Sequence, residues 1–241
     1  MSHPEQTTEE PAPAPAPREP FFNLPAAVIV AIALCVAIHL CRAYVLSPQQ
    51  DFALLIRAAF IPLRYSGQFV IDLYAFTSPV TYAFLHGSPM HLAVNMIWLA
   101  AVGTPLANRI GAARFGLFWV VTALAAAGAH YLVHPLDDAP LVGASGAISG
   151  MMAASARYAF RIDRTRRHPP YAGRLMPLGY ALRSRQALGF TAVWMGGNLL
   201  VGLLGVPGVS EAIAWEAHIG GFIAGFLLLG FFDRPPADDP S

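Results

Sequence analysis

Apolar residues in this chain gather into six long runs separated by polar, proline- or glycine-containing connections. The runs cover about residues 25–46, 89–107, 114–134, 142–160, 186–206 and 212–232. Each is close to the ~20 residues that an α-helix needs to cross ~30 Å of hydrocarbon. Because lipid offers no hydrogen bonds, a spanning segment must satisfy its own backbone, which favours helices over open sheet. The pattern predicts an all-α polytopic membrane protein with six transmembrane helices.

The flanking segments differ from these runs. Residues 1–24 are polar and rich in proline (PAPAPAPREP), and such a segment cannot bury enough apolar surface to fold. We therefore expect a disordered cytoplasmic tail at 1–24, a six-helix domain at 25–232 and a short cytoplasmic tail at 233–241. The long connection at 47–88 holds DFALLIRAAFIPL, which is too short and too charged to span, so we expect it to lie in the outer membrane interface.

Arginine is distributed unevenly over the connections. If the N-terminus lies inside and the chain crosses six times, all but three of the 15 basic residues fall on the inner side. The exceptions are Arg42, Arg57 and Arg64. Positively charged connections stay in the cytoplasm. We therefore predict an integral protein of a bacterial inner (cell) membrane with both termini cytoplasmic.

The composition agrees with lipid as the surrounding solvent. Charged residues make up 12% of the 241 residues, against ~25% in an average soluble domain, and the mean hydropathy is +0.51. A net charge of +1 gives no electrostatic reason to expect a nucleic-acid partner. Cys35 and Cys41 lie six residues apart on one expected helix, which excludes a disulfide between them.

The run at 142–160 begins with VGASGAISG, in which Ser145 stands between Gly143 and Gly146. Glycine lets a neighbouring backbone or side chain approach closely. A hydroxyl at a helix N-terminus sits where developing negative charge is favoured. Gly146 and Gly150 also form a GxxxG spacing, which on its own indicates helix packing. Both interpretations stay open for this segment taken alone.

The last run contains AWEAHIGGFIAG, with His218 one to two turns from the outer end and a GxxxG pair at Gly221 and Gly225. A lone histidine within a membrane is more often a packing residue than a base. Here, chain direction puts Ser145 and His218 at a similar depth if their two helices pack closely. A hydroxyl beside an imidazole is the nucleophile–base pairing of covalent catalysis.

The third polar group is LHGSPMHLAVN. Ser88 followed by Pro89 predicts a helix start, with a cap and then proline at the first position. His91 and Asn95 are four residues apart and share a helix face near the same outer side. Both can donate hydrogen bonds to an oxyanion, or they can bond to each other or to a neighbouring helix. His86 either supports this region or is interfacial.

Three motifs occur in a fixed order along the chain: HGSPMHLAVN, then GASGAISG, then AHIGG. In this combination, over residues 25–232, the chain resembles the rhomboid family of intramembrane serine proteases. The resemblance implies a serine endopeptidase in which Ser145 is the nucleophile and His218 the general base, without a third acid. It implies no cofactor and no metal. Its substrates would be single-span or polytopic membrane proteins, cleaved near the outer face of the bilayer.

The resemblance also implies supporting roles. His91 and Asn95 would donate hydrogen bonds to the oxyanion together with the backbone N–H of the nucleophile. Gly143 and Gly146 would shape the turn around it. One position departs from the family, because Ala107 stands where rhomboids often carry a glutamate with a structural role. That departure bears on stability or gating and leaves the chemistry unaffected.

Other polar residues are weaker candidates for chemistry. Ser149 and Ser155 lie deeper on the same expected helix, further from water, and the sequence identifies no partner for His39. His130 and His134 form an HxxxH pair whose spacing could hold zinc. No further ligand is evident, which favours an interfacial cluster over a metal site.

Two classes without catalytic activity remain as alternatives. A catalytically silent rhomboid-like protein would bind membrane proteins without cleaving them, but the chain retains both Ser145 and His218. A small transporter would carry charged or broken helices at the bilayer midplane. Here the polar residues of the spans gather toward one side instead.

Overall fold

The computed structural model describes residues 24–158, 171, 173–204 and 213–234. These residues fold mainly into helices. They also form one isolated antiparallel β-bridge, between Phe60 and Leu141. The α-helices are α1 (Ala26–Tyr44), α2 (Pro48–Ala58), α3 (Leu73–Thr81), α4 (Pro89–Trp98), α5 (Thr104–Ile110), α6 (Ala112–Val133), α7 (Ser145–Tyr158), α8 (Leu178–Ala181), α9 (Arg185–Leu204) and α10 (Trp215–Leu228). The all-α prediction is confirmed for the described part of the chain.

Within the described part of the chain, four helical segments are long and apolar enough to cross a membrane: Ala26–Tyr44, Pro89–Ile110, Ala112–Val133 and Arg185–Leu204. The second of these joins α4 to α5 through one π-helical turn, η3 (Leu99–Gly103). The two other predicted spans are shorter within the described residues, since α7 is described for 14 residues up to Tyr158 and α10 continues only through the 3₁₀ turn η5 (Leu229–Phe231). The membrane-type helical fold is therefore confirmed, and the number of six crossings stays a prediction.

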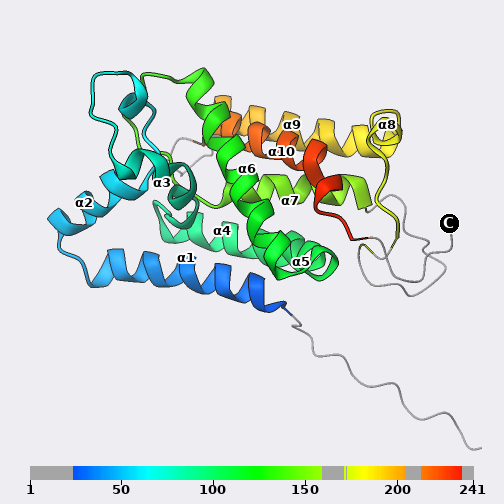
Figure 1. Ribbon diagram of the computed structural model, residues 1–241, viewed down its shortest axis with the longest axis horizontal. Coiled ribbons are helices and arrows are strands. Elements are labelled where there is room, and N and C mark those ends of the chain that lie inside the picture. Colours follow the sequence, from blue (N-terminus) through cyan, green and yellow to red (C-terminus); the bar gives the residue numbers. More distant parts are fainter. Residues whose placement is uncertain (1–23, 159–170, 172, 205–212, 235–241) are drawn as a thin grey trace, which may run out of the picture.

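Helix α7 occupies the middle of the bundle. In Figure 1, α4 and α1 lie on one side of it, and α10 and α9 lie on the other, with contacts from each layer to the next. Every residue of α7 after Ser145 is buried except Ser155, whereas α9 buries only Ala187. Because other helices enclose α7, it does not have to present a full hydrophobic length to lipid.

Helices α7 and α10 touch through their backbones. A Cβ built on Gly221 would overlap the carbonyl oxygen of Gly146, and one built on Gly225 would overlap that of Gly150. On another side of α10, a Cβ on Gly220 would overlap α6. The two GxxxG spacings therefore face each other, and the close packing that they predict is confirmed.

The fourth predicted helix begins later than its apolar run, because α7 starts at Ser145 rather than at residue 142. Leu141 and Phe60 exchange backbone hydrogen bonds of 2.8 and 3.2 Å, and the Gly143 N–H donates to the Tyr82 carbonyl at 3.1 Å. Gly143 has a φ of +125°, which glycine tolerates far better than other residues. This extended approach ends in a sharp turn that presents Ser145 as the first helical residue.

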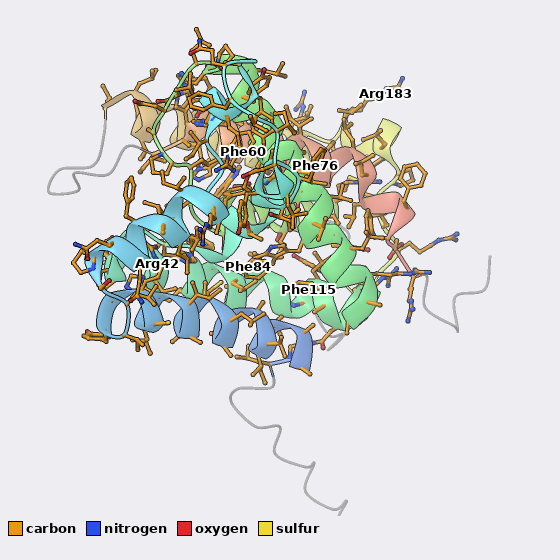
Figure 2. All side chains as sticks on the ribbon, turned by 60° about the vertical axis from the view of Figure 1, so that its left-hand side comes forward. Arg42, Phe60, Phe76, Phe84, Phe115 and Arg183 are labelled. Carbon is orange, nitrogen blue, oxygen red and sulfur yellow. The ribbon has the colours of Figure 1, made fainter. Side chains whose placement is uncertain are left out.

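The start of α1 and the end of η5 lie on the same side of the bundle (Figure 1). At that side, the Arg109 guanidinium pairs with Asp233 at 2.7 Å and the Tyr158 hydroxyl donates to Asp233 at 2.6 Å. Burial by itself would raise the pKa of the Asp233 carboxyl, but the bonds to Arg109 and Tyr158 outweigh burial and lower that pKa. Figure 2 shows Arg42 and Arg183 at opposite ends of the molecule.

Candidate active site

Ser145 lies half-buried at the start of α7, immediately after a glycine that faces His91. A Cβ built on Gly143 would lie 2.8 Å from His91 Nε2 and 3.5 Å from Ser145 Oγ. The missing side chain at Gly143 therefore leaves the small space that the His91 ring and the Ser145 hydroxyl both border. Any larger residue would fill this space and would also have to adopt the positive φ.

His218 reaches the same level from the facing helix. A Cβ built on Gly146 would lie 3.9 Å from the carbonyl oxygen of Ala217. Since Ser145 precedes Gly146 and His218 follows Ala217, the hydroxyl and the imidazole flank one contact between α7 and α10. His91 is close enough to His218 for the two rings to interact electrostatically.

Ser145 and His218 are not joined by a hydrogen bond among the bonds of the described residues. Catalytic hydrogen bonds are often long in a substrate-free enzyme and shorten when substrate binds. Ser145 and His218 therefore lie on neighbouring turns of two helices in contact, and their pairing as nucleophile and base stays a prediction.

Asn198 of α9 is a further candidate site residue, which the sequence analysis missed. Its Nδ2 donates to the Trp194 carbonyl at 2.8 Å, which leaves Oδ1 to face His218 Nδ1 at 2.6 Å. His218 therefore carries its proton on Nδ1 when neutral, and its Nε2 is the nitrogen that can accept one. One feature of the sequence could have indicated Asn198: it is a single carboxamide in the otherwise apolar run WMGGNLLVG.

The predicted donors His91 and Asn95 lie on the first turns of α4. The helix starts as predicted, with the Ser88 hydroxyl accepting from the His91 N–H at 3.2 Å and Pro89 at the first position. Asn95 is buried, and its Nδ2 donates to the His91 carbonyl at 2.9 Å. That bond uses one of the two N–H groups of the carboxamide.

His86 is buried in the connection before α4 rather than placed at an exposed interface. Its ring meets the His91 ring edge-on at 5.2 Å, and its carbonyl accepts from Arg42 Nη1 at 3.1 Å. Burial, with help from the neighbouring His91 and His39, lowers the pKa of His86 to about 3. A neutral His86 therefore supports His91 by packing.

The other serines of α7 and the departure at Ala107 lie away from this site. Ser149 is 1% exposed, one turn deeper, and Ser155 shares a hydrogen bond of 2.5 Å with the Tyr171 hydroxyl. Ala107 is buried in the hydrophobic core. Neither serine shares the position of Ser145 at the open start of the helix.

The HxxxH pair has a partner that the sequence analysis did not identify. Glu216, in the first turn of α10, approaches both His130 and His134. The expectation that no further ligand accompanies the pair is therefore wrong. It failed because the third group comes from a helix more than 80 residues further along the chain.

Comparison with known proteins adds to this geometry. The family model of the Rhomboid domain matches residues 75–234. The chain is 30% identical to Rhomboid protease GlpG of Serratia proteamaculans and 27% identical to that of Yersinia pestis, in each case over 64% of this chain and 47% of the relative. It is 29% identical to RHOMBOID-like protein 5 of Arabidopsis thaliana, over 60% of this chain and 40% of the relative.

The chain thus spans about half the length, or less, of these curated relatives. The family model, in contrast, covers well over half of the chain, including the turns that carry Ser145 and His218. The chain belongs to the rhomboid family.

Proposed function

We propose that this integral membrane protein is a serine endopeptidase that cleaves transmembrane segments of membrane proteins with a Ser145–His218 dyad. The observation that supports this most is the placement of both residues at one level of the α7–α10 contact. Rhomboid family membership and the similarity to two proteins named rhomboid protease support the same reaction class.

In the proposed reaction, His218 Nε2 takes the proton of the Ser145 hydroxyl as Oγ attacks a peptide carbonyl carbon. The carbonyl oxygen becomes an oxyanion, which His91, Asn95 and the Ser145 backbone N–H stabilise. One such donor is typically worth ~2.7–4 kcal/mol in the transition state. His218 then gives its proton to the leaving amine, and water hydrolyses the acyl-enzyme.

Asn198 has a positioning role in this scheme. By accepting from Nδ1–H it holds the His218 ring in one orientation and one tautomer, with Nε2 turned away from it. The bond also gains strength when the ring becomes positively charged in the transition state. In a catalytic triad a carboxylate orients the histidine and fixes its tautomer. Here a neutral amide oxygen would orient His218 in the same way without adding a buried charge.

We further propose that the chain crosses the membrane six times, with both termini cytoplasmic and the site open to the outer side. The side of the bundle that holds the start of α1 also holds Arg109 and Arg114, which agrees with a cytoplasmic side. Its substrates are single-span or polytopic membrane proteins. Because an intact helix hides its carbonyls in hydrogen bonds, helix-weakening residues near the outer end of a substrate should favour cleavage.

The alternative is a catalytically silent rhomboid-like protein that only binds membrane proteins. A serine-directed fluorophosphonate separates the two, because it reacts only with an activated hydroxyl. We expect covalent labelling of the purified wild type and none of Ser145→Ala. Ser149→Ala is the matched control, because it removes a hydroxyl one turn along α7 and should label normally.

Unchanged labelling of Ser145→Ala would contradict the nucleophile assignment. Absence of labelling in a folded wild type would favour the silent binding protein. A small transporter, the third possibility, would also leave the wild type unlabelled and would move a solute across vesicles.

A further inference from the structure

A second cluster of chemically competent side chains lies outside the proposed dyad, where the end of α6 meets the start of α10. His130 is in the last turn of α6, and His134 caps it. Glu216 belongs to the first turn of α10, which packs along α6. In Figure 1 both helix ends lie on the side of the bundle opposite the start of α1.

The three side chains converge on one point. His130 Nδ1 lies 2.5 Å from Glu216 Oε1, and His134 Nε2 lies 3.8 Å from the same oxygen. All three potential ligand atoms lie within 4.8 Å of one another. An i, i+4 histidine pair on one helix face with a carboxylate from another element is an arrangement that proteins use to bind zinc.

The separations suit zinc with small side-chain adjustments. Zinc binds imidazole nitrogen and carboxylate oxygen at ~2.0–2.2 Å, so ligand atoms around a tetrahedral ion are about 3.4 Å apart. The His134–Glu216 separation of 3.8 Å is already near that value, and the His130–Glu216 separation of 2.5 Å has to widen by about 1 Å.

The burial pattern also fits a site that can be loaded from water. The side chains of His130 and Glu216 are 8% and 5% exposed, whereas that of His134 is 44% exposed. Two ligands are therefore fixed within the protein, and the third forms an open edge through which an ion and a water ligand can enter. Two imidazole nitrogens in the set favour zinc over magnesium or calcium, which prefer oxygen ligands alone.

We propose that His130, His134 and Glu216 bind one zinc ion, with water in the fourth position. The ion would join the end of α6 to the start of α10. Glu216 is two residues before His218, so the bound ion would also fix the helical turn that carries the proposed base. Metal binding itself does not depend on the protease assignment.

The test uses the full chain in detergent micelles, freed of any histidine tag. Cobalt(II) is titrated as a spectroscopic substitute for zinc, and zinc is then added to displace it. We expect one equivalent of cobalt to produce the visible absorption of a four- or five-coordinate ion, and one equivalent of zinc to abolish it. Zinc should also raise the melting temperature, since a ligand that binds only the folded state stabilises it.

His134→Gln is the decisive variant, because this side chain is exposed enough for the fold to tolerate its replacement. We expect it to lower metal affinity by at least about tenfold and to remove the thermal shift. Glu216→Gln should do the same where it folds. His39→Gln, a histidine on α1 outside the cluster, should bind as the wild type does.

Two results would overturn the proposal. One is a wild type that shows no stoichiometric binding above the background of the detergent buffer. The other is His134→Gln binding zinc as tightly as the wild type. Either would leave the three residues as an ion pair with a neighbouring histidine, which holds the two helix ends together without metal.

Discussion

Replacing Asn198 by leucine tests whether the orientation of the base matters for activity. The change removes the oxygen that accepts from His218 Nδ1 at 2.6 Å and keeps a side chain of similar size. A hydrogen bond to a group that becomes charged is worth ~1.5–3 kcal/mol. At ~1.4 kcal/mol per factor of ten, the variant should lose about 10- to 100-fold in kcat.

The loss should fall on kcat with KM nearly unchanged, because in the proposed scheme Asn198 acts by orienting the base. The rate of fluorophosphonate labelling, which involves no peptide substrate, should fall by a similar factor. The variant should still fold, since α9 buries only Ala187, although the lost hydrogen bond to His218 should lower the melting temperature somewhat. Gly197→Ala is the matched control, because a Cβ there meets nothing within 4 Å.

Wild-type kcat and labelling rate in a folded Asn198→Leu protein would refute the positioning role. An effect confined to KM would also refute it. Asn198→Asp, which retains an oxygen at the same position, should recover much of the lost rate. Recovery by this variant separates orientation of the base from a general disturbance of α9.

Two further predictions concern stability. Gly221→Ala forces a methyl group onto the Gly146 carbonyl, so it should lower the free energy of unfolding by about 1–3 kcal/mol and lower the melting temperature. Gly197→Ala should change neither. A Gly221→Ala protein that melts at the wild-type temperature would contradict the backbone contact between α7 and α10. Asp233→Ala leaves the Arg109 guanidinium buried without its carboxylate and should cost about 3–5 kcal/mol in denaturant titrations. Folding lowers the pKa of Asp233, so its ion pair stabilises the protein fully above the usual aspartate pKa. This stabilisation is lost as the pH falls through the lowered pKa of the folded state. The difference in unfolding free energy between wild type and Asp233→Ala should therefore disappear in acid.

The sequence analysis could predict the dyad because the signals on which that prediction rests are local. The glycines around Ser145 and after His218 predict close approach of two helices, and chain direction puts both residues near the same ends. The start of α4 was equally local, with a serine cap and a proline. Such features depend on a few neighbouring residues and so can be interpreted without the fold.

The interactions that the sequence did not reveal all join residues distant along the chain. The contacts of Asn198 and Glu216 depend on how α9 and α10 are rotated about their axes relative to the neighbouring helices. Hydropathy does not define this rotation. The late start of α7 depends on the Phe60–Leu141 bridge, which two separate connections form.

The central claim is that Ser145 and His218 together hydrolyse a peptide bond within a membrane segment. It is tested most directly by reconstituting the purified chain in lipid vesicles with a single-span substrate that carries a helix-weakening segment near one end, and by following the cleaved product by mass spectrometry. We predict one defined cut for the wild type and for Ser149→Ala, and no product for Ser145→Ala or His218→Ala. Continued cleavage by either folded dyad variant would contradict the account.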